Sequence, residues 1–466
     1  MLTRFSKFTS RSWIWFIGTS LLFGIHVLTS RFHMQVYDAG GYMKLAHTLY
    51  HSNEVPLLLR FDSALRGYLF PLLYVPVVAA STDSAFITEE AIIKVLGALL
   101  AGFLFGVAIP ALWQLATGRR VMPLPKLVFV LAGFLLWRDY FNYTLTDFPA
   151  VACLVSGLYL LLLPRTPAWA FLAGVLVAAS INFRPVYLVV LPFVALLGTI
   201  TAVRQTNIWP VAVMQFGLAF GLGFALPCAP QWYINHHKFQ KDTPLVIGID
   251  LDDPVMVKNG DLYLQKINDG FSVQKYETSI AVDYTNAAVQ YLDPAGLHLL
   301  RQDPNQKIDS YGEYVKFMLA HPLDAVALYF RHAFNGIDVL YPTPYLYRVY
   351  TSTTVLACIN YTLLFGAILF ILLQLRQLTL LHCVIIAAVL APAGVSIPMP
   401  VECRYLLTMH LLLLTLACFG WHSVWPKLQG RLPSLAVAYL LFVGICFTLS
   451  ASTQAALAEA PKLLHP

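Results

Sequence analysis

Asp38 stands in the most unusual polar stretch of the chain. It is the third residue of Val-Tyr-Asp-Ala-Gly-Gly-Tyr at 36–42, a few residues after the first apolar run ends. The two glycines allow another group to approach the backbone closely, and Tyr37 and Tyr42 can stack on or hydrogen-bond a polar ligand. A carboxylate placed where a membrane helix has just emerged is a candidate general base.

Asp147 is the second candidate carboxylate, and it begins a predicted span directly after Thr-Leu-Thr at 144–146. At a helix start it could simply accept hydrogen bonds from free backbone N–H groups. On the same membrane face as Asp38, it could instead complete a pair in which one carboxylate is the base. The other would position that base or bind substrate hydroxyls. Both interpretations are open from the sequence.

Arg184, in Asn-Phe-Arg-Pro at 182–185, and Arg404, in Glu-Cys-Arg-Tyr at 402–405, are predicted at the same face. Each could reach toward lipid headgroups with no further role. However, arginine outside the cytoplasm runs against the usual charge bias, and a planar guanidinium suits bidentate binding of a phosphate. Glu402 could form a local ion pair with Arg404 or take part in catalysis. The supporting side chains that we expect there are Tyr37, Tyr42, Arg66, Arg138 and Glu402.

No metal or cofactor is expected. Asp250, Asp252 and Asp253 resemble the start of a cation-binding loop. They lack the further oxygen ligands and the glycine of a helix–loop–helix calcium site. The histidines lack the spacing of zinc ligands, and the chain has no glycine-rich phosphate loop.

The composition is that of a polytopic membrane protein. Of the 466 residues, 58% are hydrophobic and only 12% are charged, whereas a soluble protein carries about a quarter charged residues. The mean hydropathy is +0.67. The net charge of +6 comes from short basic clusters between apolar runs, so it indicates membrane orientation and no nucleic-acid partner.

The basic clusters orient the chain, because Lys and Arg are enriched in cytoplasmic loops. The apolar run at 68–80 is too short to cross, and if it crossed, Arg119 and Arg120 would lie outside. We therefore assign 31–88 to one outer loop with juxtamembrane helices. The chain is predicted to begin inside and end outside, with about eleven transmembrane helices near 12–30, 89–117, 122–138, 147–163, 168–183, 186–203, 208–229, 351–374, 378–398, 403–421 and 433–451.

The predicted fold class is an all-α polytopic membrane protein in three parts. Residues 1–229 form an N-terminal transmembrane module with catalytic outer loops, and residues 351–466 form a C-terminal transmembrane module. Between them the composition becomes polar, which predicts a small extracytoplasmic domain over 230–350. Two helices are expected in it, around 310–319 and 322–334.

Several short motifs resemble, in the same order, those of the C-fold (GT-C) membrane glycosyltransferases. They are Tyr37-Asp38 in the first outer loop, Leu65–Leu72 as a juxtamembrane helix, Leu145–Ala150, Phe183-Arg184-Pro185 and Val401–Leu406. The most similar branch contains protein O-mannosyltransferases and bacterial aminoarabinose lipid A transferases. Mannosyltransferases of this branch have Asp-Glu where this chain has Asp38-Ala39, so the resemblance does not define the sugar.

The resemblance implies inverting transfer of a sugar from a polyprenyl-phosphate donor to an acceptor hydroxyl at the outer membrane face. By analogy, Asp38 is the general base and Asp147 orients the acceptor or Asp38. Arg184 and Arg404 hold the leaving phosphate. The implied partners are the lipid-linked sugar, a lipid, glycan or protein acceptor, and membrane lipids. The expected location is a bacterial inner membrane with a periplasmic active site.

A transporter or flippase of a lipid-linked sugar is the alternative, because its hydropathy would be the same. Such proteins typically have inverted repeats and a polar site near the membrane midplane. In this chain the ionisable residues gather at one face and no repeat is visible. The sequence therefore favours the transferase.

Overall fold

The computed structural model describes residues 2–83, 88–163, 166–204, 208–248, 261–303, 306–350 and 353–458, with side chains from residue 12 onward except 209 and 423. The chain divides into two compact units. The N-terminal unit comprises residues 1–252 and 377–391. The C-terminal unit comprises residues 253–376 and 392–466.

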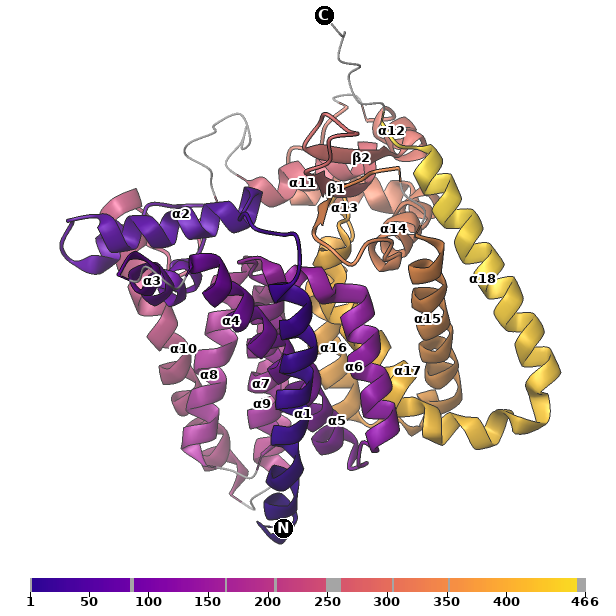
Figure 1. Ribbon diagram of the computed structural model, residues 1–466, viewed down its shortest axis with the longest axis horizontal. Coiled ribbons are helices and arrows are strands. Elements are labelled where there is room, and N and C mark those ends of the chain that lie inside the picture. Colours follow the sequence, from indigo (N-terminus) through magenta and orange to yellow (C-terminus); the bar gives the residue numbers. More distant parts are fainter. Residues whose placement is uncertain are drawn as a thin grey trace, which may run out of the picture. The chain divides into compact units, whose positions relative to one another are not determined.

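Helices form the N-terminal unit, and most of them run side by side (Figure 1). Two short ones, α2 (Tyr37–His51) and α3 (Leu69–Thr82), lie at one end of the others, as expected for juxtamembrane helices (Figure 1). The remaining elements are α1 (Leu2–Leu28), η1 (Leu57–Arg60), α4 (Glu89–Phe103), η2 (Leu104–Ala108), α5 (Ile109–Thr117), α6 (Pro123–Trp137), η3 (Arg138–Asn142), α7 (Asp147–Leu162), α8 (Pro167–Phe183), η4 (Pro185–Val190), α9 (Leu191–Arg204), α10 (Trp209–Phe239) and the first part of α16 (Leu380–Ser396).

Local sequence explains several of these bounds. The side chain of Thr88 accepts a hydrogen bond from the backbone N of Ala91 and so begins α4. Gly118, with φ of 69°, ends α5 in the left-handed conformation that commonly closes helices. Pro123 and Pro167 open α6 and α8, where a proline costs no helical hydrogen bond.

The helix α10 continues past the predicted end of its span at 229. The composition becomes polar there, but Gln231 and Asn235 are buried, and Nε2 of Gln231 donates to Oδ1 of Asn235 at 2.9 Å. These amides satisfy each other, so the helix runs on to Phe239. The boundary predicted at 229–230 therefore falls inside a helix.

The C-terminal unit combines long helices with a small mixed sheet. In the sheet, β1 (Val273–Ser279) lies between β2 (Ala288–Leu292), which is antiparallel to it, and β3 (Tyr345–Leu346), which is parallel. The remaining elements are α11 (Leu262–Ser272), α12 (Pro294–Leu300), α13 (Tyr311–Ala320), α14 (Pro322–Ile337), α15 (Thr354–Gln374), η5 (Leu375–Gln377), the end of α16, η6 (Cys403–Leu406), α17 (Leu407–Leu428), η7 (Gln429–Arg431) and α18 (Leu432–Ala455).

The sheet was not predicted within 230–350, whereas α13 and α14 confirm the two helices expected there. The strand β1 is buried along almost its whole length, although its sequence is Val-Gln-Lys-Tyr-Glu-Thr-Ser. A strand buried on both faces with polar residues lacks the alternation of apolar and polar residues that signals a strand.

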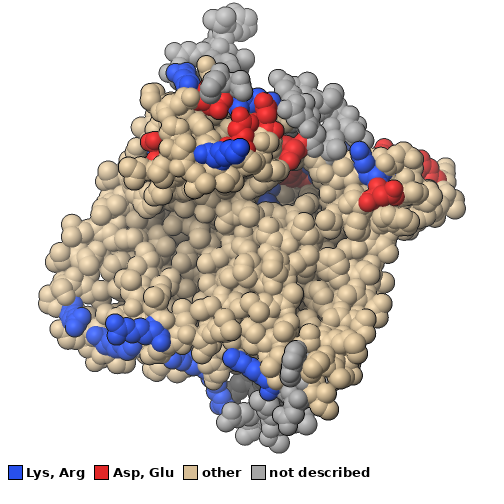
Figure 2. Space-filling view, turned by 180° about the vertical axis from the view of Figure 1, so that it is seen from behind, with Lys and Arg blue, Asp and Glu red and all other residues tan. Residues whose placement is uncertain are grey.

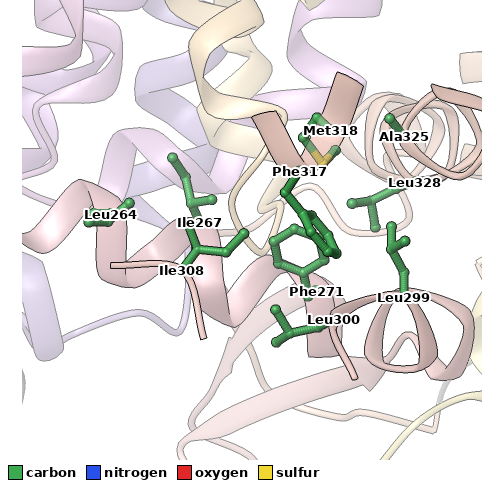
Figure 3. Close-up of a cluster of buried hydrophobic side chains, with 10 residues drawn as sticks. All are labelled: Leu264, Ile267, Phe271, Leu299, Leu300, Ile308, Phe317, Met318, Ala325 and Leu328. Carbon is green, nitrogen blue, oxygen red and sulfur yellow. The ribbon is translucent and has the colours of Figure 1, made fainter. Parts of the chain in front are cut away.

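A hydrophobic core joins α11, α12, α13 and α14. Figure 3 shows its ten buried side chains, which are Leu264, Ile267, Phe271, Leu299, Leu300, Ile308, Phe317, Met318, Ala325 and Leu328. The rings of Phe271 and Phe317 meet edge to face, with centroids 6.0 Å apart. This core fixes which faces of α13 and α14 point inward.

The protein is an integral membrane protein by the length and composition of its helices. Among the described residues, six helices are long and apolar enough to cross a membrane: Glu89–Thr117, Pro185–Arg204, Pro210–Phe239, Thr354–Gln377, Cys403–His422 and Val424–Ala455. On the face drawn in Figure 2, much of the surface carries no charged side chain. The total of eleven spans stays a prediction.

Candidate functional site

Asp38 lies in the first turn of α2, and Arg66 reaches it from the loop between η1 and α3. Nη2 of Arg66 lies 3.0 Å from Oδ1 of Asp38. Gly41 allows this approach, because a Cβ there would lie only 3.0 Å from the guanidinium carbon of Arg66. The Asp38 side chain is still 44% exposed, so a ligand can reach its carboxylate.

Tyr42, one turn after Asp38, connects this pair with the rest of the site. The guanidinium carbon of Arg66 lies over its ring, 5.1 Å from the centroid, and its hydroxyl forms a hydrogen bond with the side chain of Thr146. Burial and the charge of Asp38 raise the pKa of Tyr42, although Thr146, Arg66 and Arg184 act to lower it. The uncharged hydroxyl of Tyr42 is therefore close enough to Asp38, Arg66 and Arg184 to interact electrostatically with all three.

Asp147 begins α7 and Arg184 follows the end of α8, and their side chains form an ion pair. The Asp147 side chain is only 2% exposed, and a carboxylate so deeply buried requires a partner. The backbone N of Arg184 donates to the carbonyl oxygen of Ser180, and its own carbonyl accepts from Tyr187, both at 3.0 Å. Arg184 is thus held in place by both adjoining helices, with Asp147 enclosed against it.

Hydrogen bonds fasten the segment around the start of α2 to the loop before α7. Oγ1 of Thr144 donates to the carbonyl oxygen of Ala39, the residue after Asp38, at 2.8 Å. Oε1 of Gln35 accepts from the backbone N of Thr144 at 2.9 Å, and its Nε2 donates to the carbonyl of Asn142 at 3.0 Å. These bonds bring the start of α2 next to the loop that leads into α7.

The loop carrying Arg66 packs against the end of α8. A Cβ on Gly67 would lie 2.0 Å from the carbonyl oxygen of Asn182, so glycine is required for this contact. The backbone N of Leu69 donates to Oδ1 of Asn182 at 3.0 Å. Because Asn182 lies two residues before Arg184, the contact holds Arg66 and Arg184 in neighbouring segments.

Gln231 of α10 supports the same loop through a chain of buried amides. Its Oε1 accepts from the backbone N of Tyr68 at 3.2 Å and from Nδ2 of Asn182 at 3.0 Å. Asn235, to which Gln231 donates, in turn donates to the carbonyl oxygen of Thr243 at 2.8 Å. A buried polar network with its partners satisfied favours one arrangement of the segments it joins.

Tyr37 and Arg138 are two further predicted site residues, and only Tyr37 lies beside Asp38 in the chain. Tyr37 begins α2 with φ of 47°, a conformation that non-glycine residues rarely adopt, and its ring is exposed. Arg138 donates to the carbonyl oxygen of Leu135 at 3.0 Å and lies over the ring of Phe134. These contacts keep Arg138 on the end of α6, so the structure gives it no described link to Asp38.

Glu402 and Arg404 belong to the C-terminal unit, where they pair with each other. Nε of Arg404 lies 2.7 Å from Oε2 of Glu402, and both side chains are buried. This is the local ion pair that the sequence left open as an alternative to catalysis. A phosphate-binding role for Arg404 stays a prediction.

A further buried charged cluster surrounds β1 in the C-terminal unit. Nζ of Lys275 lies 3.6 Å from Oε1 of Glu277 and donates to the carbonyl oxygen of Asp338 at 3.1 Å. Burial raises the pKa of Glu277 to about 7, which Lys275 opposes and Glu402 reinforces. These groups partner one another inside the unit, which is typical of a structural cluster.

No group of three His, Cys, Asp or Glu side chains in the described part of the chain could hold a metal ion. The aspartates considered for a cation loop, Asp250, Asp252 and Asp253, lie outside the described residues.

The chemistry available in the N-terminal unit comes from four groups. Asp38 offers an exposed carboxylate that can accept a proton from a hydroxyl. Arg66 and Arg184 offer guanidinium groups that suit a phosphate, and Tyr42 offers a neutral hydroxyl. Asp147 is enclosed against Arg184, so its carboxylate is not open to a ligand.

The sequence interpretation missed Gln35, Thr144 and Gln231, which hold these groups together. Each is an uncharged polar residue, and none belongs to a recognisable motif. The available signal was a polar side chain close to an apolar run, where it must find a partner. That signal predicts burial with hydrogen bonds, but it does not identify the partner.

Comparison of the chain with models of protein families, with curated protein sequences and with solved structures finds no match.

Proposed function

We propose that this protein transfers a sugar from a polyprenyl-phosphate donor to an acceptor hydroxyl at the outer face of the membrane. The observation that carries the proposal is the convergence of Asp38, Arg66 and Arg184 around Tyr42 in the N-terminal unit. Asp38 lies at the start of α2, Arg66 lies in the segment before α3, and Arg184 follows the end of α8. An exposed base beside two cations suits a hydroxyl acceptor and a phosphate leaving group.

The proposed reaction is a single displacement with inversion. The acceptor hydroxyl gives its proton to the Asp38 carboxylate while its oxygen forms a bond to the anomeric carbon. The bond between that carbon and the donor phosphate oxygen breaks, and the polyprenyl phosphate leaves with the electron pair. Arg184 and Arg66 stabilise the charge that develops on the phosphate, and no metal ion is needed for this step.

Two roles follow from the ion pairs of the site. Arg66 balances the charge of Asp38 in the protein without substrate, and it can turn to the phosphate when the donor binds. Asp147 orients Arg184, because it is enclosed while Arg184 is the more exposed partner. The acceptor remains a lipid, a glycan or a protein.

The proposal includes the topology predicted from the charge pattern. With eleven spans, Asp38, Asp147 and Arg184 share one side, and the clusters containing Arg119, Arg204 and other basic residues share the opposite side. A bacterial inner membrane with a periplasmic active site fits this orientation. A transporter or flippase of lipid-linked sugars is the second candidate, since the same phosphate-binding groups would serve it.

Label transfer with matched variants tests the proposal. Purified protein is incubated with radiolabelled polyprenyl-phosphate sugars and membrane extract as the acceptor. We expect transfer by the wild type and by Asp62→Asn, and at least a hundred-fold loss, about 2.7 kcal/mol, in Asp38→Asn. Asp62 is the control because it lies in the same loop, exposed, 3.7 Å from Lys238. Normal turnover by Asp38→Asn would exclude it as the base.

A further inference from the structure

The helices α13 and α14 carry two apolar faces. One face supplies Phe317, Met318, Ala325 and Leu328 to the core shown in Figure 3. The other face points away from that core. Its large apolar side chains, each more than half exposed, are Val315, Leu319, Leu323, Val326 and Phe330.

The spacing of the outer side chains makes one continuous stripe along each helix. Val315 and Leu319 are four residues apart on α13, whereas Leu323, Val326 and Phe330 follow the three- and four-residue spacing of one helical face on α14. A surface helix of a soluble domain needs only one apolar face. A second contiguous apolar face marks an interaction surface.

Contacts within the C-terminal unit fix where the end of α14 lies along the long apolar helices α15 and α17. Nδ2 of Asn360 in α15 donates to the carbonyl oxygen of Ile337, the last residue of α14, at 2.7 Å. Nε2 of His410 in α17 lies 2.8 Å from the carbonyl oxygen of Gly336. Figure 1 shows α14 at the upper end of α15 accordingly.

The position of Asn360 along α15 gives the depth in the membrane at which α14 contacts α15. The 21 residues of α15 extend over about 31 Å, close to the ~30 Å of a bilayer hydrocarbon core. Asn360 lies six residues after Thr354, or about 9 Å along the helix. The last turn of α14 therefore lies about 9 Å below the outer end of α15, in the outer part of the membrane.

We infer that α13 and α14 lie in the outer membrane interface, with their outer apolar stripe inserted among the lipid acyl chains. Lipid is the occupant because Phe334, one turn beyond Phe330 on α14, packs in one cluster with Ala357 and Tyr361 of the apolar helix α15. Interfacial helices bury an apolar face about 5–10 Å deep, which matches the depth given by Asn360. The inference is independent of the proposed function.

Spin-label accessibility measures the surroundings of this stripe. Leu323→Cys, Val326→Cys and Phe330→Cys are each labelled in the full-length protein, in nanodiscs of phosphatidylethanolamine and phosphatidylglycerol. Collision rates with oxygen, which concentrates in lipid, and with a water-soluble nickel chelate are then compared. Labelled wild type supplies the background of the native cysteines, and elution as a single species confirms that each variant is folded.

Asp324→Cys is the matched control, because it is exposed on the same turn but points away from the stripe. We expect the oxygen collision rate to exceed the nickel rate at 323, 326 and 330, and the reverse at 324. A high nickel rate at all four positions would overturn the inference by showing that water surrounds the stripe. Low rates with both reagents at 323, 326 and 330 would also overturn it, since protein would then cover the face.

Discussion

At the scale of single residues, the site depends on which charges pair. Asp38 and Asp147 are the same residue type, yet one is exposed beside Arg66 and the other is enclosed with Arg184. The sequence predicted all four residues as members of the site. It could not predict the pairing, because exposure and partners depend on loops that are distant along the chain.

The Asp147–Arg184 pair makes a prediction about stability. Arg184→Ala leaves a buried carboxylate without its cation, and we expect it to lower the free energy of unfolding by on the order of 2 kcal/mol, allowing for the partial exposure of Arg184. The double variant Asp147→Asn with Arg184→Ala should recover most of that loss, because asparagine carries no charge. Thermal unfolding of both in one detergent measures the difference. A double variant as unstable as Arg184→Ala alone would show that the carboxylate is not the cause.

At the scale of elements, the site depends on how loops are fastened to helices. The apolar runs and their prolines predicted most helices well, because length and hydrophobicity decide where a membrane helix begins and ends. The continuation of α10 to Phe239 was not predicted. Gln231 and Asn235 are polar, so from the sequence they indicate a linker, whereas in the structure they are buried and hydrogen-bonded to each other.

Thr144 tests the fastening of the first loop. Thr144→Val keeps the shape of the side chain but removes the hydrogen bonds to Ala39 and Gln35, which should cost about 1–3 kcal/mol. We expect faster amide exchange over residues 36–42 by hydrogen–deuterium mass spectrometry. Thr48→Val is the matched control, since Thr48 in α2 donates only to the carbonyl of Lys44 among the described contacts. Equal exchange in both variants would mean that Thr144 does not hold the loop.

At the scale of the whole molecule, two compact units each combine membrane helices with extramembrane parts. The predicted boundaries followed composition, whereas the units follow packing, and α16 contributes residues to both. The sheet around β1 lay beyond sequence reasoning because its strand is buried and polar. Lys275 and Glu277 of this strand pair with each other, and Lys275 also donates to the backbone carbonyl of Asp338, far away in the sequence.

Glu277 gives the stability of the protein a pH dependence. Its pKa is about 7 in the folded chain because of burial, against 4.5 for the ordinary side chain. Between these pH values the folded state binds more protons than the unfolded state. The contribution of Glu277 to the free energy of unfolding therefore falls as the pH rises from about 4.5 to about 7. Melting temperatures across this range should decline in the wild type and change less in Glu277→Gln. An identical decline in the variant would assign the effect to other groups.

The fate of the lipid-linked sugar in proteoliposomes is the most direct test of the transferase. Mass spectrometry would follow the donor, the acceptor and free polyprenyl phosphate over time, with Asp38→Asn alongside. The proposed reaction predicts that the wild type alone converts the donor to polyprenyl phosphate while the acceptor gains the sugar with inverted configuration. Intact donor that crosses to the opposite leaflet, without release of polyprenyl phosphate, would contradict the transferase and identify a lipid transporter.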